Sequence, residues 1–187
     1  MGIAQLRKNY EIEIRWKAFP LHPETPEAGL TLEELFAGRA IDIKKMMSRL
    51  KQAADELGLP LGERKKTYNS RLAQELAKWA ESRGMGDPFH EAVFRAYFVD
   101  GRNIGKVDEL VALAKSLDLS EQEARFVLES RTFKEAVDED WARSHSLKIT
   151  GVPTFLVGRR ATVGFQPYGA LEQFLTNCGA KNRKHPF

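Results

Sequence analysis

Few residues in this chain are suited to thiol or acid–base chemistry. There is one cysteine, Cys178, and it cannot form an intramolecular disulfide or a cysteine-based zinc cage. It precedes Gly179 at the end of a predicted helix, so we interpret it as a packing residue rather than a nucleophile. The four histidines are His22, His90, His145 and His185. None has a partner at metal-ligand spacing, so no metal site is expected.

A second notable feature is the corner in residues 149–158, with the sequence ITGVPTFLVG. Pro153 stands directly before an apolar run, Thr154 to Val157, that predicts a buried strand. Proline has no N–H to donate to a sheet, but X–Pro bonds adopt the cis form at a cost of only about 0.5–1 kcal/mol. On the residues alone two alternatives stay open. A cis proline would re-aim the chain and expose the backbone of Val152, whereas a trans proline would simply start a strand.

Composition and charge exclude several functional classes. The chain has 187 residues, 42% of them hydrophobic, with 29 Lys and Arg against 26 Asp and Glu. These charges are interspersed, and the one basic cluster, residues 181–184, is interpreted as part of a polar tail, so no nucleic-acid partner is expected. No run of about 18 apolar residues occurs, so no membrane partner is expected. The first seven residues lack the apolar stretch of a signal peptide, which favours a cytoplasmic location.

The periodicity of apolar residues changes along the chain. Residues 11–19 alternate between charged and apolar side chains, which predicts an edge strand with one wet face. Helical patterns follow for over a hundred residues, with capping signals at Thr31, at Asn69-Ser70 and at Ser120. After Leu147 the strand period returns. The order predicted there is a strand at 154–157, a turn at 158–160, a returning strand at 161–165 and a helix at 170–178.

This order predicts an α/β domain interrupted by a helical block. We expect residues 1–30 and 147–180 to form the two parts of the α/β domain. Residues 31–146 are the predicted all-helical insertion, and residues 181–187 the tail.

Two groups of residues resemble a known family. Gly-Val-Pro-Thr-Phe at 151–155, followed by a hairpin, Gly-Phe-Gln-Pro at 164–167 and a final helix, resembles the closing half of a thioredoxin fold. The sequence FRAYFVDGRNI at 94–104, with Leu35-Phe36, Asn69-Ser70 and AKWA at 77–80, is similar to the DsbA-like oxidoreductases. The FrnE-type branch, near the 2-hydroxychromene-2-carboxylate isomerases, matches best, from about Tyr10 to Leu175. The fold class expected is α/β, a thioredoxin-like fold with a large all-helical insertion, N-terminally truncated.

The resemblance assigns roles at the proline corner. It implies that Pro153 is cis and faces a Cys-x-x-Cys site, that the backbone of Val152 pairs with bound substrate, and that Thr154 begins the strand. His22 lies in a Pro-rich loop that the family keeps near the rim of the site. A weak substrate role for His22 and a plain solvent-exposed loop residue stay open as alternatives.

The resemblance also implies that part of the family's site is missing. In the family the dithiol lies at the N-terminus of the first helix, after the first strand, whereas Met1 to Lys8 resembles only the end of that helix. No Cys-x-x-Cys occurs, so no catalytic residue is expected in this chain. The missing strand would lie between residues 11–19 and the strand after Pro153. Three explanations stay open: a true start further upstream, a truncated and inactive product, or a second chain that supplies the strand.

The leading functional hypothesis is a DsbA-like thiol–disulfide oxidoreductase that is inactive as written. One alternative is a glutathione-dependent isomerase with serine at the attacking position, for which glutathione would be required; otherwise no cofactor is expected. Another is a degenerate thioredoxin-like domain that binds extended peptides. The partners expected are a protein or small-molecule disulfide substrate, and a homodimer is left open.

Overall fold

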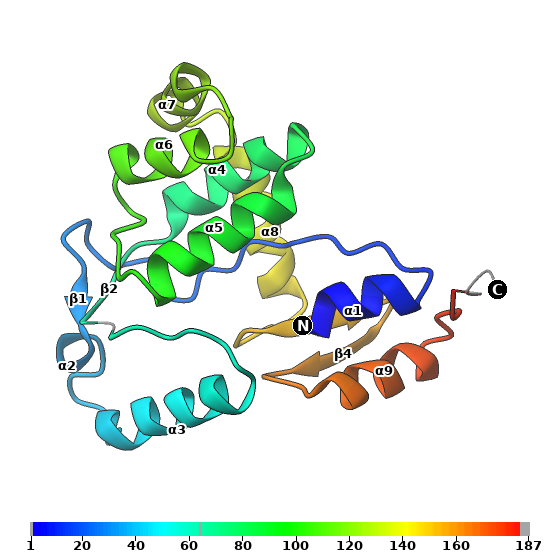
Figure 1. Ribbon diagram of the computed structural model, residues 1–187. Helices are drawn as coiled ribbons and strands as arrows, with labels where there is room; N and C mark the ends of the chain where they lie inside the picture. Colours follow the sequence, from blue (N-terminus) through cyan, green and yellow to red (C-terminus); the bar gives the residue numbers. More distant parts are fainter. Residues whose placement is uncertain (1, 64, 184–187) are drawn as a thin grey trace. The chain divides into compact units, whose positions relative to one another are not determined.

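The structure, a computed structural model, describes residues 2–63 and 65–183 (Figure 1). The described residues form two compact units. One unit, here called the helical unit, contains residues 22–63 and 65–139. The other, called the sheet unit, contains residues 2–21 and 140–183. No helix in these described ranges is both long and apolar enough to cross a membrane.

The helical unit is built from helices and one very short strand pair. Two-residue strands, β1 (Leu30–Thr31) and β2 (Lys66–Thr67), pair antiparallel and were not predicted. The helices that lie wholly in this unit are α2 (Leu32–Leu35), α3 (Ile43–Glu56), α4 (Arg71–Ser82), α5 (Gly86–Phe98), α6 (Val107–Lys115) and α7 (Glu121–Ser130). A further helix, α8 (Lys134–Ser146), begins in the helical unit and ends in the sheet unit.

Polar side chains start several of these helices. The predicted capping box at Thr31 is present, because its hydroxyl accepts from the Glu34 N–H at 3.1 Å and the Glu34 carboxylate accepts from the Thr31 N–H at 2.7 Å. Ser120 caps α7 by accepting from the Glu123 N–H at 3.3 Å. At α4 the capping side chain is Asn69, whose Oδ1 accepts from the Arg71 N–H at 2.9 Å.

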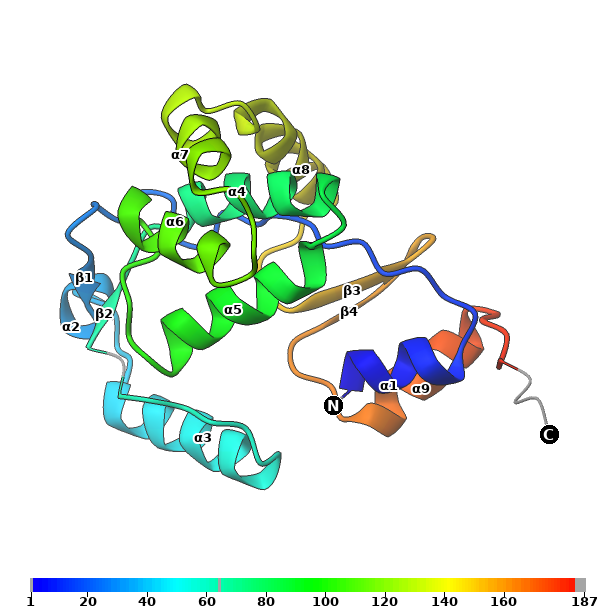
Figure 2. The same ribbon diagram turned by 45° about the horizontal axis from the view of Figure 1, so that its top comes forward.

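The core of the helical unit lies among α4 to α7, which surround it in Figures 1 and 2. Its largest fully buried apolar side chains are Leu76, Phe89, Leu110 and Leu128, each from a different one of these helices. The apolar residues recur at three- and four-residue spacing along each helix, which places them on one face. Helical periodicity therefore predicted this part of the fold well.

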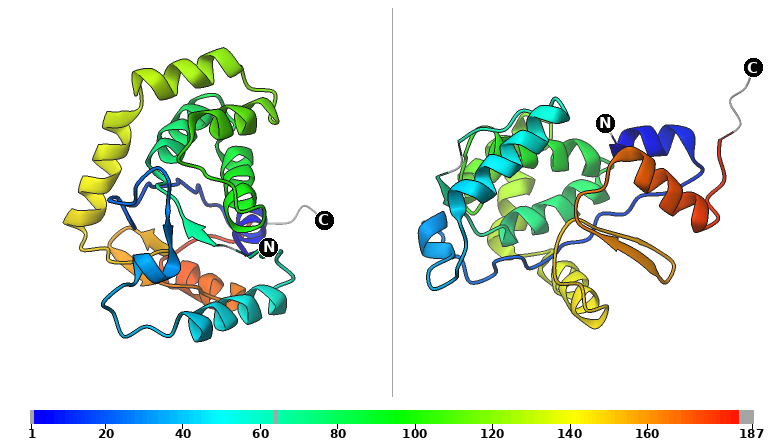
Figure 3. Two further views of the ribbon diagram at one scale, coloured as in Figure 1. Left: turned by 90° about the vertical axis from the view of Figure 1, so that its left-hand side faces the viewer. Right: turned by 90° about the horizontal axis from the view of Figure 1, so that it is seen from below.

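The sheet unit has a small core between two helices and a hairpin. Its elements are α1 (Gly2–Asn9), the strands β3 (Thr154–Val157) and β4 (Arg160–Val163), and α9 (Tyr168–Asn177). The helices α1 and α9 lie side by side in Figures 1 and 2 and in the right view of Figure 3. Leu6, Tyr10, Leu171 and Leu175 are buried between them, and Phe155 and Val157 of β3 pack against this cluster. The hairpin and the final helix were predicted with their ends within two residues.

The predicted strand at residues 11–19 does not form. Its charged residues are exposed and Ile12, Ile14 and Trp16 are half-buried, as alternation predicts. No neighbouring strand pairs with it among the described residues, and a strand needs a partner for its backbone groups. The Ala18 N–H instead donates to the carboxylate of Asp140 at 3.0 Å. The segment is therefore extended but outside any sheet.

The polar tail is partly anchored. Asn182 forms an isolated antiparallel bridge with Tyr10. The Glu11 N–H donates to the Lys181 carbonyl, and the Arg183 N–H donates to the carbonyl of Asn9, both at 2.8 Å. Residues 181–183 thus continue the ordered sheet unit, whereas residues 184–187, including His185, lie outside the described part.

Candidate functional site

The proline corner opens the hairpin of the sheet unit. The peptide bond between Val152 and Pro153 is cis. Two hydrogen bonds of 2.7 Å fix the corner: the Thr154 hydroxyl donates to the Gly151 carbonyl, and the Gly164 N–H donates to the Pro153 carbonyl. Val152 and Pro153 are exposed, and Thr154 is half-buried. The three predicted site residues are therefore consecutive and accessible at the start of β3.

The pairing of β3 leaves its second edge open. Val157 pairs with Arg160 across a two-residue turn, where Gly158 has φ 60°, as the first central residue of a type II′ turn requires. Hydrogen-bonded pairs alternate from there, at Val157, at Phe155 and at Pro153. The backbone N–H and C=O of Thr154 and Leu156 therefore point away from β4. No other described strand pairs with this edge.

One face of the same hairpin is apolar and exposed. Thr154 lies opposite Val163, and Leu156 opposite Ala161, so their side chains share a face. Leu156 is 38% exposed and Val163 is 57% exposed, and Phe165 just beyond β4 is also exposed. The opposite face carries Phe155 and Val157 into the core. The corner thus combines an open strand edge with an apolar surface, an arrangement that can hold an extended peptide.

Nearly the whole chain matches the model of a known protein family. The model of the DSBA-like thioredoxin domain matches residues 1–176. The chain belongs to this family. The predicted thioredoxin-like fold with a helical insertion is thereby confirmed.

Individual proteins resemble the chain over most of its length. The uncharacterized protein YwbO of Bacillus subtilis (strain 168) is 26% identical over 159 residues, which cover 81% of this chain and 74% of YwbO. A probable DsbA oxidoreductase from Streptomyces coelicolor, SCO1869, superposes with a TM-score of 0.83 at 25% identity, covering 95% of this chain and 79% of that one. A 2-hydroxychromene-2-carboxylate isomerase shares the fold, with a TM-score of 0.71 at 20% identity over 95% of this chain and 85% of its own.

The two other candidate residues, His22 and Cys178, belong to other segments of the chain. His22 belongs to the helical unit and is half-buried, and its carbonyl accepts from the Thr25 N–H at 3.2 Å. Cys178 is half-buried and follows α9, where its N–H donates to the carbonyls of Leu175 and Phe174 at 3.0 and 3.1 Å. Cys178 therefore lies at the end of a helix, as predicted.

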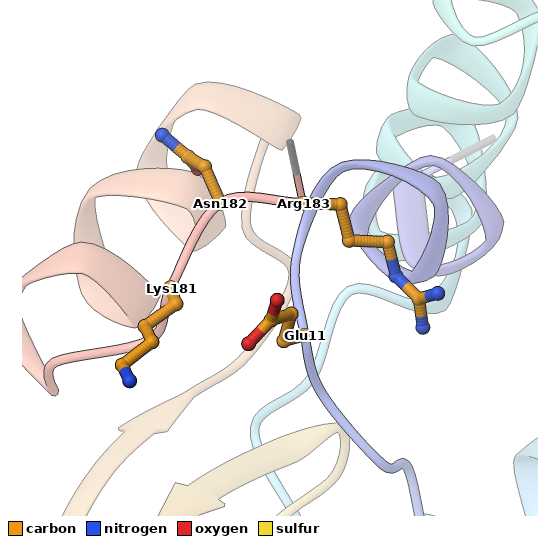
Figure 4. Close-up of a pocket in the computed structure, with 4 residues that line it drawn as sticks. All are labelled: Glu11, Lys181, Asn182 and Arg183. Carbon is orange, nitrogen blue, oxygen red and sulfur yellow. The ribbon is translucent and has the colours of Figure 1, made fainter. Parts of the chain in front are cut away.

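A shallow surface pocket in the sheet unit was not predicted. It is lined by Glu11, Lys181, Asn182 and Arg183, beside the bridge that anchors the tail (Figure 4). All four lining residues are exposed, and none is apolar, which differs from the mainly apolar lining of most ligand sites. Within the described ranges no group of three or more His, Cys, Asp or Glu side chains is placed to hold a metal ion. The proline corner therefore stands as the candidate site.

Sequence reasoning did not identify Leu156, Val163 and Phe165 as candidate site residues. Their apolar side chains were taken as evidence for strands. The signal that distinguishes them is the two-residue alternation along the hairpin, which places Phe155 and Val157 inward and Leu156 outward.

Proposed function

We propose that this chain provides the substrate-binding half of a DsbA-like thiol–disulfide oxidoreductase site, of the FrnE-type branch. In this proposal the backbone of Val152 pairs with an extended substrate beside Pro153 and Thr154. The observation that carries the proposal is the exposed Val152 before the cis bond to Pro153, beside an exposed apolar face, in a chain of this family. The substrate is a protein or small molecule that contains a disulfide.

The thiol chemistry itself requires cysteines that this sequence does not contain. Dithiol–disulfide exchange needs one thiolate to attack and a second thiol to resolve the mixed disulfide. The sequence has only Cys178, at the end of α9. We therefore propose that the 187 residues alone are inactive in disulfide exchange. In this proposal a strand that pairs with β3 and leads into a helix supplies the thiols. The open edge of β3 and the unpaired extended segment at 11–19 both support a further strand. A reducing compartment such as the cytoplasm suits a chain with one free cysteine.

Insulin reduction tests the inactive status directly. With glutathione or dithiothreitol as reductant, we expect the purified chain to precipitate insulin no faster than reductant alone. The variant Cys178→Ser should give the same background rate. Clear turnover by the wild type that is lost in Cys178→Ser would contradict the proposal and make Cys178 the nucleophile.

The second candidate is a glutathione-dependent isomerase. The single cysteine favours it, because an isomerase that uses serine at the attacking position needs no dithiol. The in-frame DNA upstream of Met1 distinguishes the two. A Cys-Pro-x-Cys motif there supports the oxidoreductase, serine at its first position supports the isomerase, and an immediate stop codon leaves a peptide-binding domain as the function.

A further inference from the structure

Helix α3 of the helical unit has one strongly apolar face. Its fourteen residues run from Ile43 to Glu56 and start from an Asp42 cap, whose carboxylate accepts from the Lys45 N–H at 2.9 Å. At 3.6 residues per turn, the apolar side chains fall within one arc of about 120°. The side chains on this arc are Ile43, Met46, Met47, Leu50, Ala53, Ala54 and Leu57. The remaining arc is entirely polar.

The protein buries this apolar face only in part, and Ile43, Met46, Met47 and Ala53 are half-buried. Only Ala54 of the helix is buried. Leu50 is 41% exposed, and Leu57 directly after the helix is 43% exposed. Two more large apolar side chains beside the helix ends, Ile41 and Leu59, are also exposed. Such a continuous apolar patch on a surface marks a contact with something outside the unit.

Positive charges border the apolar arc on both sides. Lys44 and Lys51 lie next to one border and Arg49 next to the other, as the helical spacing places them. The acidic residues Asp55 and Glu56 lie further round, on the polar side. All five of these charged side chains belong to exposed residues. Long basic side chains at the borders can reach outward while their stems cover apolar surface.

This charge pattern selects between two occupants of the face. In a symmetric antiparallel pair of α3 helices, each border would face the same border of the second copy. Arg49 would then face arginine, whereas Lys44 would lie opposite Asp55 of the second copy, so the charges give such a pair no consistent attraction. An anionic bilayer surface attracts all three cations, and its acyl boundary accepts the apolar arc.

We propose that α3 lies in the interface of an anionic phospholipid bilayer, with Leu50 at the centre of the inserted face. This is surface binding by an amphipathic helix, which needs no membrane-spanning segment. It is independent of the function proposed for the proline corner. The occupant is the lipid surface itself, held by apolar insertion and by phosphate contacts of Lys44, Lys51 and Arg49.

Vesicle sedimentation of the full chain tests this proposal. The probes are vesicles of phosphatidylcholine alone and of phosphatidylcholine with phosphatidylglycerol. We expect the wild type to sediment with the anionic vesicles and to be released by salt. Leu50→Glu should lower the partition coefficient about tenfold or more, because it replaces the leucine that the bilayer would bury with a charged side chain. Lys51→Glu should lower it by about tenfold, since each basic residue near the surface adds roughly 1 kcal/mol.

The matched control is Phe126→Glu on α7. Phe126 is 66% exposed and lies in the same unit, but on another helix. This variant should bind vesicles like the wild type, and far-UV circular dichroism should show unchanged helix content in all variants. The proposal is overturned if the wild type stays in the supernatant, or if Phe126→Glu weakens binding as much as Leu50→Glu. It is also overturned if light scattering shows a dimer that Leu50→Glu dissociates.

Discussion

Arg131 donates two parallel hydrogen bonds to the carboxylate of Glu75, from Nε at 2.7 Å and from Nη2 at 2.6 Å. Glu75 is completely buried within α4. Arg71 donates to the same carboxylate at 2.5 Å and also contacts Asp138 of α8 at 2.7 Å. Two guanidinium groups thus surround one buried carboxylate and tie α4 to the residue after α7 and to the start of α8.

Removing the buried carboxylate should destabilise the helical unit strongly. Glu75→Ala leaves Arg131 and Arg71 without their shared partner, and breaking such a pair costs about 3 kcal/mol in free energy of unfolding. Urea denaturation followed by circular dichroism measures this loss. Glu129→Ala is the control, because its contact with Arg125 is 3.7 Å long and exposed, and it should cost less than about 0.5 kcal/mol. Equal losses of stability in the two variants would contradict the structural role given to the buried Glu75 carboxylate.

The Glu75 carboxylate also makes the free energy of unfolding depend on pH. Burial raises the pKa of Glu75, but the hydrogen bonds and charges of Arg131 and Arg71 outweigh it, so the pKa lies below its ordinary value of 4.5. A lowered folded-state pKa contributes stability above pH 4.5 that is lost as the pH falls through the folded value. Glu75→Gln should therefore show a shallower loss of unfolding free energy below pH 4.5 than the wild type. Parallel pH profiles of the two proteins would be the contrary result.

His90 on α5 should produce a second pH effect at milder acidity. Burial, helped by the charge of Lys78, lowers its pKa to about 4, from 6.5. The neutral imidazole stacks on Phe94, with ring centroids 6.2 Å apart. The unfolded chain binds a proton below pH 6.5 whereas the folded protein does not, so stability is lost as the pH falls from 6.5 to 4, by about 3 kcal/mol.

The substitution His90→Gln should abolish this part of the pH profile. Imidazole resonances in NMR titration give the pKa of His90 directly. His145→Gln, at an exposed position on α8, is the matched substitution and should leave the profile unchanged. A His90 that titrates near 6.5 would contradict the described burial.

The sequence predicted those parts of the fold that are determined by local signals. Thr31 and Ser120 start helices because their hydroxyls satisfy free N–H groups within three residues, which a sequence records directly. The hairpin was predictable because a short apolar run, a glycine at the turn and a returning strand are contiguous. Gly-Val-Pro-Thr-Phe likewise located the candidate site through the family resemblance.

Features that depend on a distant partner were not predictable. Residues 11–19 have the alternation of a strand, but alternation fixes only which side chains point inward and carries no information about a neighbouring strand. Tyr10 pairs instead with Asn182, 172 positions later, through a single bridge that no pattern marks. The open edge of β3 was expected only through the family resemblance, which places the missing strand beside it, because a residue pattern alone does not show which backbones pair.

Gly62 should tolerate no side chain. A Cβ built there would lie 2.0 Å from the carbonyl oxygen of Val99, while the Gly62 N–H donates to the carbonyl of Phe98 at 2.9 Å. Because backbone cannot move aside cheaply, Gly62→Ala should lower the free energy of unfolding by about 2 kcal/mol or more. Gly169→Ala, in the first turn of α9 with open space around it, should be neutral or stabilising by up to about 1 kcal/mol. Thermal melts of both variants measure the contrast, and a stable Gly62→Ala protein would show that the two segments lie further apart.

Hydrogen exchange should reveal the open edge of β3 residue by residue. The N–H groups of Phe155 and Val157 donate toward β4, whereas those of Thr154 and Leu156 point to the unpaired side. We expect the amides of Thr154 and Leu156 to exchange at least about tenfold faster than those of Phe155 and Val157, because a paired strand amide exchanges only when the pairing opens. Amide exchange followed by NMR on the purified chain measures the four rates. An added peptide strand that pairs with this edge, as the proposed further strand would, should slow exchange at Thr154 and Leu156 selectively. Uniform protection of all four amides in the chain alone would mean that the edge is already covered, and the proposal of a further strand that pairs with β3 would then be wrong.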